Sequence, residues 1–460
     1  MKCFTNTCHI LASQKLRTTL TSHFIRFPLL LLGWMPFCLK NCPNSLWIDS
    51  TRSLGICILS AVICMGRGHH YVGHDHAKAQ THQDTAPDDN IVSLVTAANQ
   101  NFGFRLYMKL AAHADSQGKN IFFSPISVSV ALAALSVGAR GETHQQLFSG
   151  LGFNSTLYTQ ADIDQAFQKL LKTSSEETSE GTAVFVDHGF KPRPEFLETL
   201  KQFYFADGFN VDFTNSTESA NTINEYVREK TKGKIDQLVE NLDGSTVMYL
   251  LSYIYFKGKW ATPFDPDLTK EDLFSVDENT KVVPVQMMNK EERFDIYYDQ
   301  AVSTSVLHLP FNSSCSMLLM LPNDMKALEN AICPAHVTKW LKWMNSRKYD
   351  LYIPKFSIKT SYSMNDVLTE MGMTDMFGDQ ADLSGITEGQ KLAVSKVVHK
   401  ATLDIDEAGA TATAATGIRI NYMSLEYPLV LKFNRPFMVA VVDRHTENIL
   451  FVGKIINPNI

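Results

Sequence analysis

The stretch Glu407-Ala408-Gly409-Ala410-Thr411-Ala412-Thr413-Ala414-Ala415-Thr416-Gly417-Ile418-Arg419-Ile420 decides how the rest of the chain is interpreted. Side chains of a strand alternate between its faces, so one face here would carry only small and apolar residues and the other small or polar ones. Such a segment could enter the middle of a sheet, yet Ala and Gly are poor strand formers. Two interpretations follow: an ordinary Ala/Thr linker, or a mobile loop that later becomes a central strand.

The residues just before this stretch predict a strand that leads directly into it. Apolar residues alternate with more polar ones over 397–406, which is typical of a strand with one solvated face. A second strand is predicted at 247–256, which is almost continuously apolar, and a hairpin at 437–443 and 449–455. Helical periodicity or an Ala-rich apolar pattern predicts helices at 92–112, at 125–137, around 163–171 and around 220–227, the last ended by Gly233.

Residues 90–460 contain no repeat and no Pro/Gly-rich seam, so we expect one mixed α+β domain there. The segment before it differs, with six of the eight cysteines and two apolar runs at 27–32 and 54–63. The second run has the length of a secretory h-region and is too short to span a bilayer; a signal anchor at 24–39 is the alternative. We therefore expect a signal peptide with an upstream extension at 1–66 and a disordered His/Asp-rich tail at 67–89.

Composition narrows the partners and the chemistry. Proteins that bind nucleic acids are usually basic, whereas this chain has a net charge of −6 and a pI near 6.2, so no nucleic-acid partner is expected. No membrane partner is expected either. The His-rich tract 69–76 has two interpretations, a metal site or a solvated tail; the tail is favoured, so no metal or cofactor is predicted. No Gly-x-Ser-x-Gly, His-Glu-x-x-His, Cys-x-x-Cys or phosphate-loop motif indicates an enzyme.

Two further features bear on the compartment. Glycosylation acceptors occur at Asn154, Asn215 and Asn312, and three of them behind a signal-like run favour secretion to the extracellular space. Beyond the first 90 residues only Cys315 and Cys333 remain, as two free thiols or one bridge.

Five motifs in order carry a resemblance to a known family across about 370 residues. They are Asn120-Ile-Phe-Phe-Ser-Pro-Ile-Ser127, Asn224-Glu-Tyr-Val227 through Thr231-Lys-Gly-Lys-Ile235, Tyr255-Phe-Lys-Gly-Lys-Trp260, Ala408 to Ala415, and Phe433-Asn-Arg-Pro-Phe437. The chain resembles a serpin, in the extracellular alpha-1-antitrypsin-like clade. The resemblance implies a cluster of helices packed on three β-sheets, with residues of about 407–428 as an exposed reactive-centre loop.

The same resemblance implies a suicide-substrate inhibitor. A chymotrypsin-fold serine protease would attack the loop through its serine, and the cut loop would insert into the main sheet before the acyl-enzyme is hydrolysed. Family spacing puts the reactive bond at the seventeenth residue counted from Glu407, which is Met423–Ser424. Met423 suits an apolar, elastase-like pocket, and cleavage after Arg419 by a trypsin-like enzyme is the alternative.

The composition of the hinge favours an inhibitor. The hinge comprises Glu407, Ala408, Gly409, Ala410, Thr411, Ala412, Thr413, Ala414 and Ala415. Its small side chains could slip between two paired strands, it has no Pro, and no charge lies in the inward-facing set. The alternative from another class is a non-inhibitory serpin that carries a small apolar hormone, for which a bulky or charged hinge would be expected.

The resemblance assigns roles to further residues. Ser124, Ser127, Ser252 and His399 would form a hydrogen-bonded cluster where the sheet opens, although His399 alone is typical of a satisfied core histidine and Ser252 replaces a frequent asparagine. Glu407 and Lys355 would pair at the top of the sheet, with Trp260 packed beneath; the plain alternatives are surface charges and a core Trp. We expect the protein to act as a monomer.

Overall fold

The computed structural model describes residues 87–172, 178–235, 237–239, 242–277, 281–408 and 427–460. All of them belong to the unit Gly66–Ile460, and the unit Met1–Met65 lies outside the described residues. Outside them too are the predicted signal segment, the His/Asp-rich tail to residue 86, the hinge from Gly409 to Ala415 and the bond Met423–Ser424.

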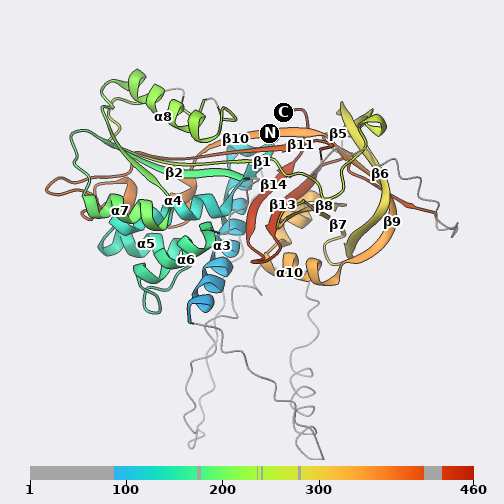
Figure 1. Ribbon diagram of the computed structural model, residues 1–460, viewed down its shortest axis with the longest axis horizontal. Coiled ribbons are helices and arrows are strands. Elements are labelled where there is room, and N and C mark those ends of the chain that lie inside the picture. Colours follow the sequence, from blue (N-terminus) through green and yellow to red (C-terminus); the bar gives the residue numbers. More distant parts are fainter. Residues whose placement is uncertain (1–86, 173–177, 236, 240–241, 278–280, 409–426) are drawn as a thin grey trace, which may run out of the picture. The chain divides into compact units, whose positions relative to one another are not determined.

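Helices surround a five-stranded sheet on both faces (Figure 1). Five of them gather beneath one face: α3 (Pro87–Ala112), α4 (Pro125–Gly138), α5 (Gly141–Leu151), α6 (Gln160–Lys172) and α7 (Pro194–Phe203). On the opposite face lies α8 (Ser216–Lys230), and the others are α9 (Met325–Ala331), α10 (Pro334–Trp343) and α11 (Asn365–Glu370). Among the described residues, no helix combines the length and apolar character needed to cross a bilayer.

The helix boundaries follow from local chemistry. The Ser124 hydroxyl accepts the backbone N–H of Ser127 and Pro125 occupies the first turn, so α4 begins where the family motif places it. Past the end of α8, Gly233 takes a positive φ of 76° and its N–H bonds back to Arg228. The first helix begins at Pro87, so residues 87–89, predicted to be part of the tail, are helical.

The five-stranded sheet carries the strand that precedes the hinge. Its order is β10 (Phe356–Ser363), β11 (Lys396–Ile405), β4 (Met248–Phe256), β2 (Thr178–Asp187) and β3 (Asp207–Val211). All nine residues of β4 are buried, as expected for a strand covered on both faces.

The remaining strands form a second, nine-stranded sheet. They are β1 (Ile121–Phe123), β5 (Lys270–Ser275), β6 (Val282–Asp299), β7 (Thr304–Pro310), β8 (Cys315–Pro322), β9 (Asn345–Pro354), β12 (Leu429–Lys432), β13 (Phe437–Asp443) and β14 (Ile449–Ile455). The predicted hairpin is present as β13 and β14, with the predicted bounds.

The α+β class is confirmed, and the sheet count needs one qualification. Three sheets were expected, but in the described part of the chain two hydrogen-bonded sheets are present. The cause is β6, which is 18 residues long and pairs with β5 and β9 along most of its length and with β7 near its end. It therefore joins two of the expected sheets into one ladder.

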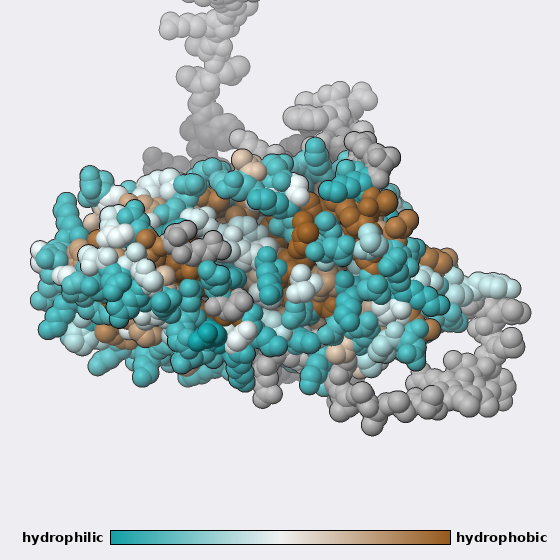
Figure 2. Space-filling model, turned by 90° about the horizontal axis from the view of Figure 1, so that it is seen from above, coloured by the Kyte–Doolittle hydropathy of each residue, from teal (hydrophilic) through white to brown (hydrophobic). Residues whose placement is uncertain are grey.

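Three apolar clusters hold these layers together. One fills the space between α3–α7 and the inner face of the five-stranded sheet, a second lies between the two sheets, and a third lies beneath α8 on the outer face. Figure 2 shows that hydrophilic side chains cover most of one face, while hydrophobic ones gather toward the side on which β5 and β6 lie in Figure 1. Exposed apolar side chains on that side include Leu273 and Val282.

Candidate functional site

The candidate site is the line where β4 and β11 meet, called the seam from here on. These strands pair in parallel, with Lys396 opposite Tyr249 and Leu403 opposite Phe256. Their flanking partners, β2 and β10, are antiparallel to them. A parallel pair in the middle of such a sheet leaves a place where one further strand would run antiparallel to both neighbours.

On the inner face of the seam His399 joins three elements. Its Nε2 accepts the backbone N–H of Ser124 at 3.0 Å, and its Nδ1 lies 3.0 Å from Ser252 Oγ on β4. Because Nε2 is an acceptor, the ring proton sits on Nδ1 and points to Ser252. Burial lowers the pKa of His399 to about 3, so the ring is neutral.

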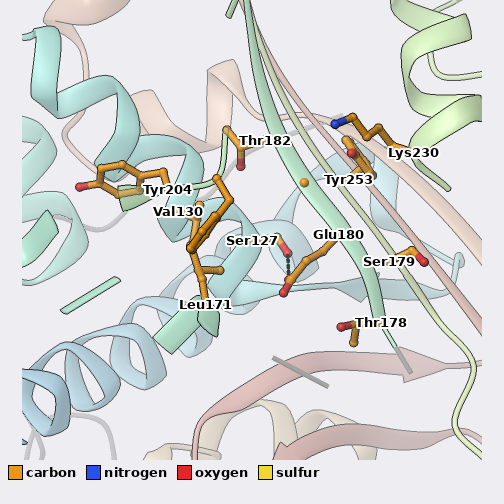
Figure 3. A pocket seen from close by; sticks show the side chains of 12 residues that line it. Ser127, Val130, Leu171, Thr178, Ser179, Glu180, Thr182, Tyr204, Lys230 and Tyr253 are labelled. Atoms are coloured by element: carbon orange, nitrogen blue, oxygen red, sulfur yellow. Dashed lines mark hydrogen bonds between the residues drawn. The ribbon is translucent and has the colours of Figure 1, made fainter. Parts of the chain in front are cut away.

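Ser127 is placed differently from the other predicted members of this cluster. Its backbone N–H donates to Ser124 Oγ at 3.2 Å, but its hydroxyl donates to Glu180 Oε2 of β2 at 3.4 Å. Figure 3 shows the two side chains meeting at a pocket that Tyr253 also lines. The structure thus brings His399, Ser124 and Ser252 into contact, and Ser127 reaches His399 only through Ser124.

At the top of the seam the residues just after β11 are held by the segment that follows β4. The backbone N–H of Trp260 donates to the carbonyl of Ala408 at 3.1 Å. The indole Nε1 of the same residue donates to the carbonyl of Asp406 at 2.8 Å. Phe264 N–H donates to the carbonyl of Glu407 at 3.1 Å. The start of the hinge is therefore fixed by backbone as well as side-chain contacts.

Glu407 is the centre of a second set of contacts. Its Oε2 lies 2.9 Å from Lys355 Nζ, and its Oε1 accepts the Thr269 hydroxyl at 2.9 Å. Burial acts to raise the pKa of Glu407, but the hydrogen bonds from Lys355, its own backbone and Thr269 outweigh burial and hold the pKa below its usual value. The carboxylate is 12% exposed while the lysine is 46% exposed, so this is a half-solvated pair.

Trp260 packs as well as donates. It is buried, its ring stacks on Phe311 with centroids 4.6 Å apart, and it meets Phe264 edge-on at 6.0 Å. The two interpretations of Trp260, as a core residue and as a support of the hinge, are both consistent with this geometry.

The predicted modification sites and cysteines are placed as follows. Asn154, Asn215 and Asn312 are all exposed, and Asn215 also caps α8. Cys315 is buried and Cys333 is half-buried, and no disulfide joins the two in the structure.

Sequence reasoning missed two supports of the hinge. Thr269 binds Glu407, and Lys257 pairs with Asp406 at 2.9 Å. The alternation of side chains between the two faces of β4 and β11 does place polar residues near one another at the top of the sheet. It does not reveal the register, which decides which of them touch.

Comparison with known proteins bears directly on this arrangement. The family model described as "Serpin (serine protease inhibitor)" matches residues 97–458. The chain belongs to the serpin family. Similar serpins include an alpha-1-antitrypsin-like protein of Tamias sibiricus, 39% identical over 418 residues, with 89% of this chain and 99% of that protein covered. Alpha-1-antitrypsin of Meriones unguiculatus is 38% identical, with 89% and 100% covered.

Solved structures give the same fold. Human thyroxine-binding globulin, in a complex with thyroxine, superposes with a TM-score of 0.75 at 34% identity, covering 80% of this serpin and 100% of that chain. Human glycosylated kallistatin gives a TM-score of 0.73 at 38% identity, covering 80% and 99%. The serpin fold and the antitrypsin-like relationship expected from the motifs are thus confirmed.

Proposed function

We propose that this serpin is a secreted inhibitor that traps a chymotrypsin-fold, elastase-like serine protease as a suicide substrate. The observation that carries the proposal is the closed parallel seam with the hinge at its end. β11 runs directly into the hinge, so a loop folding back beside β11 would be antiparallel to β11 and, because β4 is parallel to β11, antiparallel to β4 also. The seam therefore offers the slot that loop insertion requires.

The reaction follows from the chemistry of serine proteases. The protease serine attacks the carbonyl carbon of Met423, the Met423–Ser424 bond breaks, and the new amino group of Ser424 leaves with a proton from the protease histidine. The carbonyl of Met423 remains esterified to the protease. If the hinge then enters the seam, the tethered protease is carried away from Ser424 and its active site is distorted before water cleaves the ester. Insertion must be faster than deacylation for the trap to hold.

The composition of the hinge supports an inhibitor over a simple substrate. In an inserted strand Ala410, Ala412 and Ala414 would bring only small side chains to the inward face, where a larger or charged group would have to be buried between β4 and β11. Met423 in turn supports an enzyme with a moderately apolar pocket.

Secretion rests on separate observations. An apolar run at 54–63 has the length of the h-region of a signal peptide, and the three acceptor asparagines are exposed, where glycans can be attached. One relative at 38% identity is named a hibernation-specific plasma protein, of Tamias sibiricus.

The test is incubation with pancreatic elastase followed by a denaturing gel and mass spectrometry of the released fragment. We expect a covalent complex that survives denaturation, together with a fragment beginning at Ser424. Met423→Arg serves as the matched variant and should move complex formation from elastase to trypsin. The proposal is contradicted if the wild type with elastase and Met423→Arg with trypsin both give only cleaved serpin and no covalent complex.

The alternative remains a non-inhibitory carrier of a small apolar hormone. The likeness to thyroxine-binding globulin is the specific observation in its favour. Tight binding of thyroxine or a steroid by equilibrium dialysis, combined with the absence of any covalent protease complex, would favour the carrier.

A further inference from the structure

The outer face of the seam has a contact of its own, distinct from the His399 cluster beneath it. Tyr255 of β4 donates its hydroxyl to Asp404 Oδ2 of β11 at 2.9 Å. In the parallel register Tyr255 stands opposite Thr402, so Asp404 is its diagonal neighbour on the same face. This hydrogen bond crosses the line along which the sheet would part.

Tyr255 is held in position from above. Its side chain is buried with 7% of its surface exposed, and Lys234 Nζ, from the segment after α8, lies 5.7 Å from the ring centroid. Burial and the neighbouring Asp404 carboxylate raise the pKa of Tyr255 well above its usual value. The phenol therefore remains protonated at neutral pH and can donate this hydrogen bond.

Asp404 has a second partner that lies on the other side of it. Ser357 of β10 donates its hydroxyl to Asp404 Oδ1 at 2.6 Å. Ser357 and Asp404 are directly paired in the antiparallel ladder of β10 and β11. One carboxylate thus makes one bond across the seam and one bond within a strand pair that does not need to separate.

Insertion of a strand changes these two bonds very differently. Neighbouring strands lie about 4.8 Å apart, so a strand placed between β4 and β11 roughly doubles their separation. A bond of 2.9 Å between Tyr255 and Asp404 cannot span that gap, whereas Ser357 and Asp404 stay on adjacent strands. The carboxylate keeps one partner after opening and is not left buried alone.

We propose that Tyr255 and Asp404 form an outer-face clasp that sets the rate at which the seam opens for the hinge. The clasp is a positioning contact, because both residues lie within strands of the sheet and would act through the separation of β4 and β11. The proposal rests on the proposed function, since it assumes that a strand enters between β4 and β11. It adds a residue pair that tunes the rate, and it predicts a specific difference between the two bonds of Asp404.

The experiment uses the full-length, uncleaved protein and a fluorescent synthetic peptide of residues 407–420 as the probe. Uptake of the peptide is followed by co-elution in size-exclusion chromatography, and amide hydrogen exchange of β4 and β11 is measured on the same samples. Tyr255→Phe removes the hydroxyl and keeps the ring. Ser357→Ala is the matched control, because it removes the other hydrogen bond to the same carboxylate.

Tyr255→Phe should take up the peptide roughly tenfold faster than the wild type, which is the scale expected for one hydrogen bond to a charged group. Ser357→Ala should stay within about twofold of the wild type. Asp404→Ala should accelerate uptake as Tyr255→Phe does, and combining the two should add nothing, since both remove the same hydrogen bond across the seam. Faster exchange should be confined to amides along the seam.

Four results would overturn the clasp, and they separate its failure from a failure of the proposed function. Equal uptake by the wild type and Tyr255→Phe, or equal acceleration by Tyr255→Phe and Ser357→Ala, contradicts the clasp and leaves the proposed inhibitor function intact. No uptake by any variant contradicts both, because the seam then does not admit a strand. A change in unfolding midpoint without a change in uptake assigns Tyr255 to stability alone.

Discussion

His399 Nδ1 on β11 lies 3.0 Å from Ser252 Oγ on β4, so a single neutral imidazole bridges the seam from its inner side. The opposite ring nitrogen accepts the N–H of Ser124 at the start of α4. Protonation of Nε2 would direct a proton at that N–H, and the charge would sit in a fully buried site. The bridge therefore depends on His399 remaining neutral.

This dependence predicts a pH effect on stability. An unfolded histidine takes up a proton near pH 6.5, whereas folded His399 does so only near pH 3. The contribution of neutral His399 to the free energy of unfolding should therefore be complete above about pH 6.5. Below that pH the free energy of unfolding should fall by about 1.4 kcal/mol per pH unit because of this residue, until the pH reaches about 3. Urea unfolding at about pH 7 and about pH 5, on either side of the unfolded value, measures it. His399→Gln is the comparison and should lack this part of the slope; identical slopes would rule out the assignment.

The contact between Glu407 and Lys355 predicts an effect on kinetics more than on stability. Lys355→Met should speed uptake of the 407–420 peptide, while the unfolding free energy changes by only about 0–1 kcal/mol because the lysine is well exposed. The pKa of Glu407 is depressed, so its contribution is present above the usual pKa of about 4.3 and is lost as the pH falls below it. Lys359→Met, at an exposed position of β10, is the control and should leave uptake unchanged.

Trp260 gives a prediction about the anchoring of the hinge. Trp260→Phe keeps an aromatic ring against Phe311 but loses the indole donation to the Asp406 carbonyl. We expect the unfolding free energy to fall by about 1–3 kcal/mol, since the Asp406 carbonyl loses a donor. Trp343→Phe serves as the control because Trp343 is 58% exposed. Equal losses in the two variants would show that the bond to Asp406 contributes nothing.

The alternation within the hinge predicts a contrast between neighbours. Ala412→Asp would place a carboxylate on the inward face of an inserted strand, and Thr413→Asp would place one on the outward face. Ala412→Asp should convert the serpin from inhibitor to substrate, with cleaved product replacing the covalent elastase complex on a gel. Thr413→Asp should retain most of the complex. The reverse order would show that the inward set has been assigned to the wrong face.

Much of the fold could be predicted from sequence because its signals are local. The bounds of β13 and β14 follow from two apolar segments that flank a polar turn, and α4 follows from Ser124, Pro125 and an apolar run. The start of the first helix was predicted too late, because Asp88 and Asp89 are charged and residues 87–89 show no apolar periodicity; Pro87 in the first turn is the signal that was available.

The contacts within the site were harder to predict from the sequence, because they depend on which residues of neighbouring strands stand opposite each other. Ser252 and His399 were expected near each other from the family resemblance, and the ladder pairs them. The Ser127 hydroxyl of α4 turns to Glu180 of β2, and Thr269, just before β5, reaches Glu407, just after β11. These contacts depend on how elements far apart in the sequence pack together, which the sequence pattern does not reveal. Alternation assigns a side chain to a face but does not name its partner across the sheet.

Thermal unfolding before and after a single cut in residues 409–426 tests loop insertion most directly. Cleavage at Met423–Ser424 by a catalytic amount of elastase should raise the unfolding temperature sharply, because the freed hinge becomes a new central strand between β4 and β11. An unchanged or lower unfolding temperature after complete cleavage would contradict insertion, and with it the proposed mechanism of inhibition.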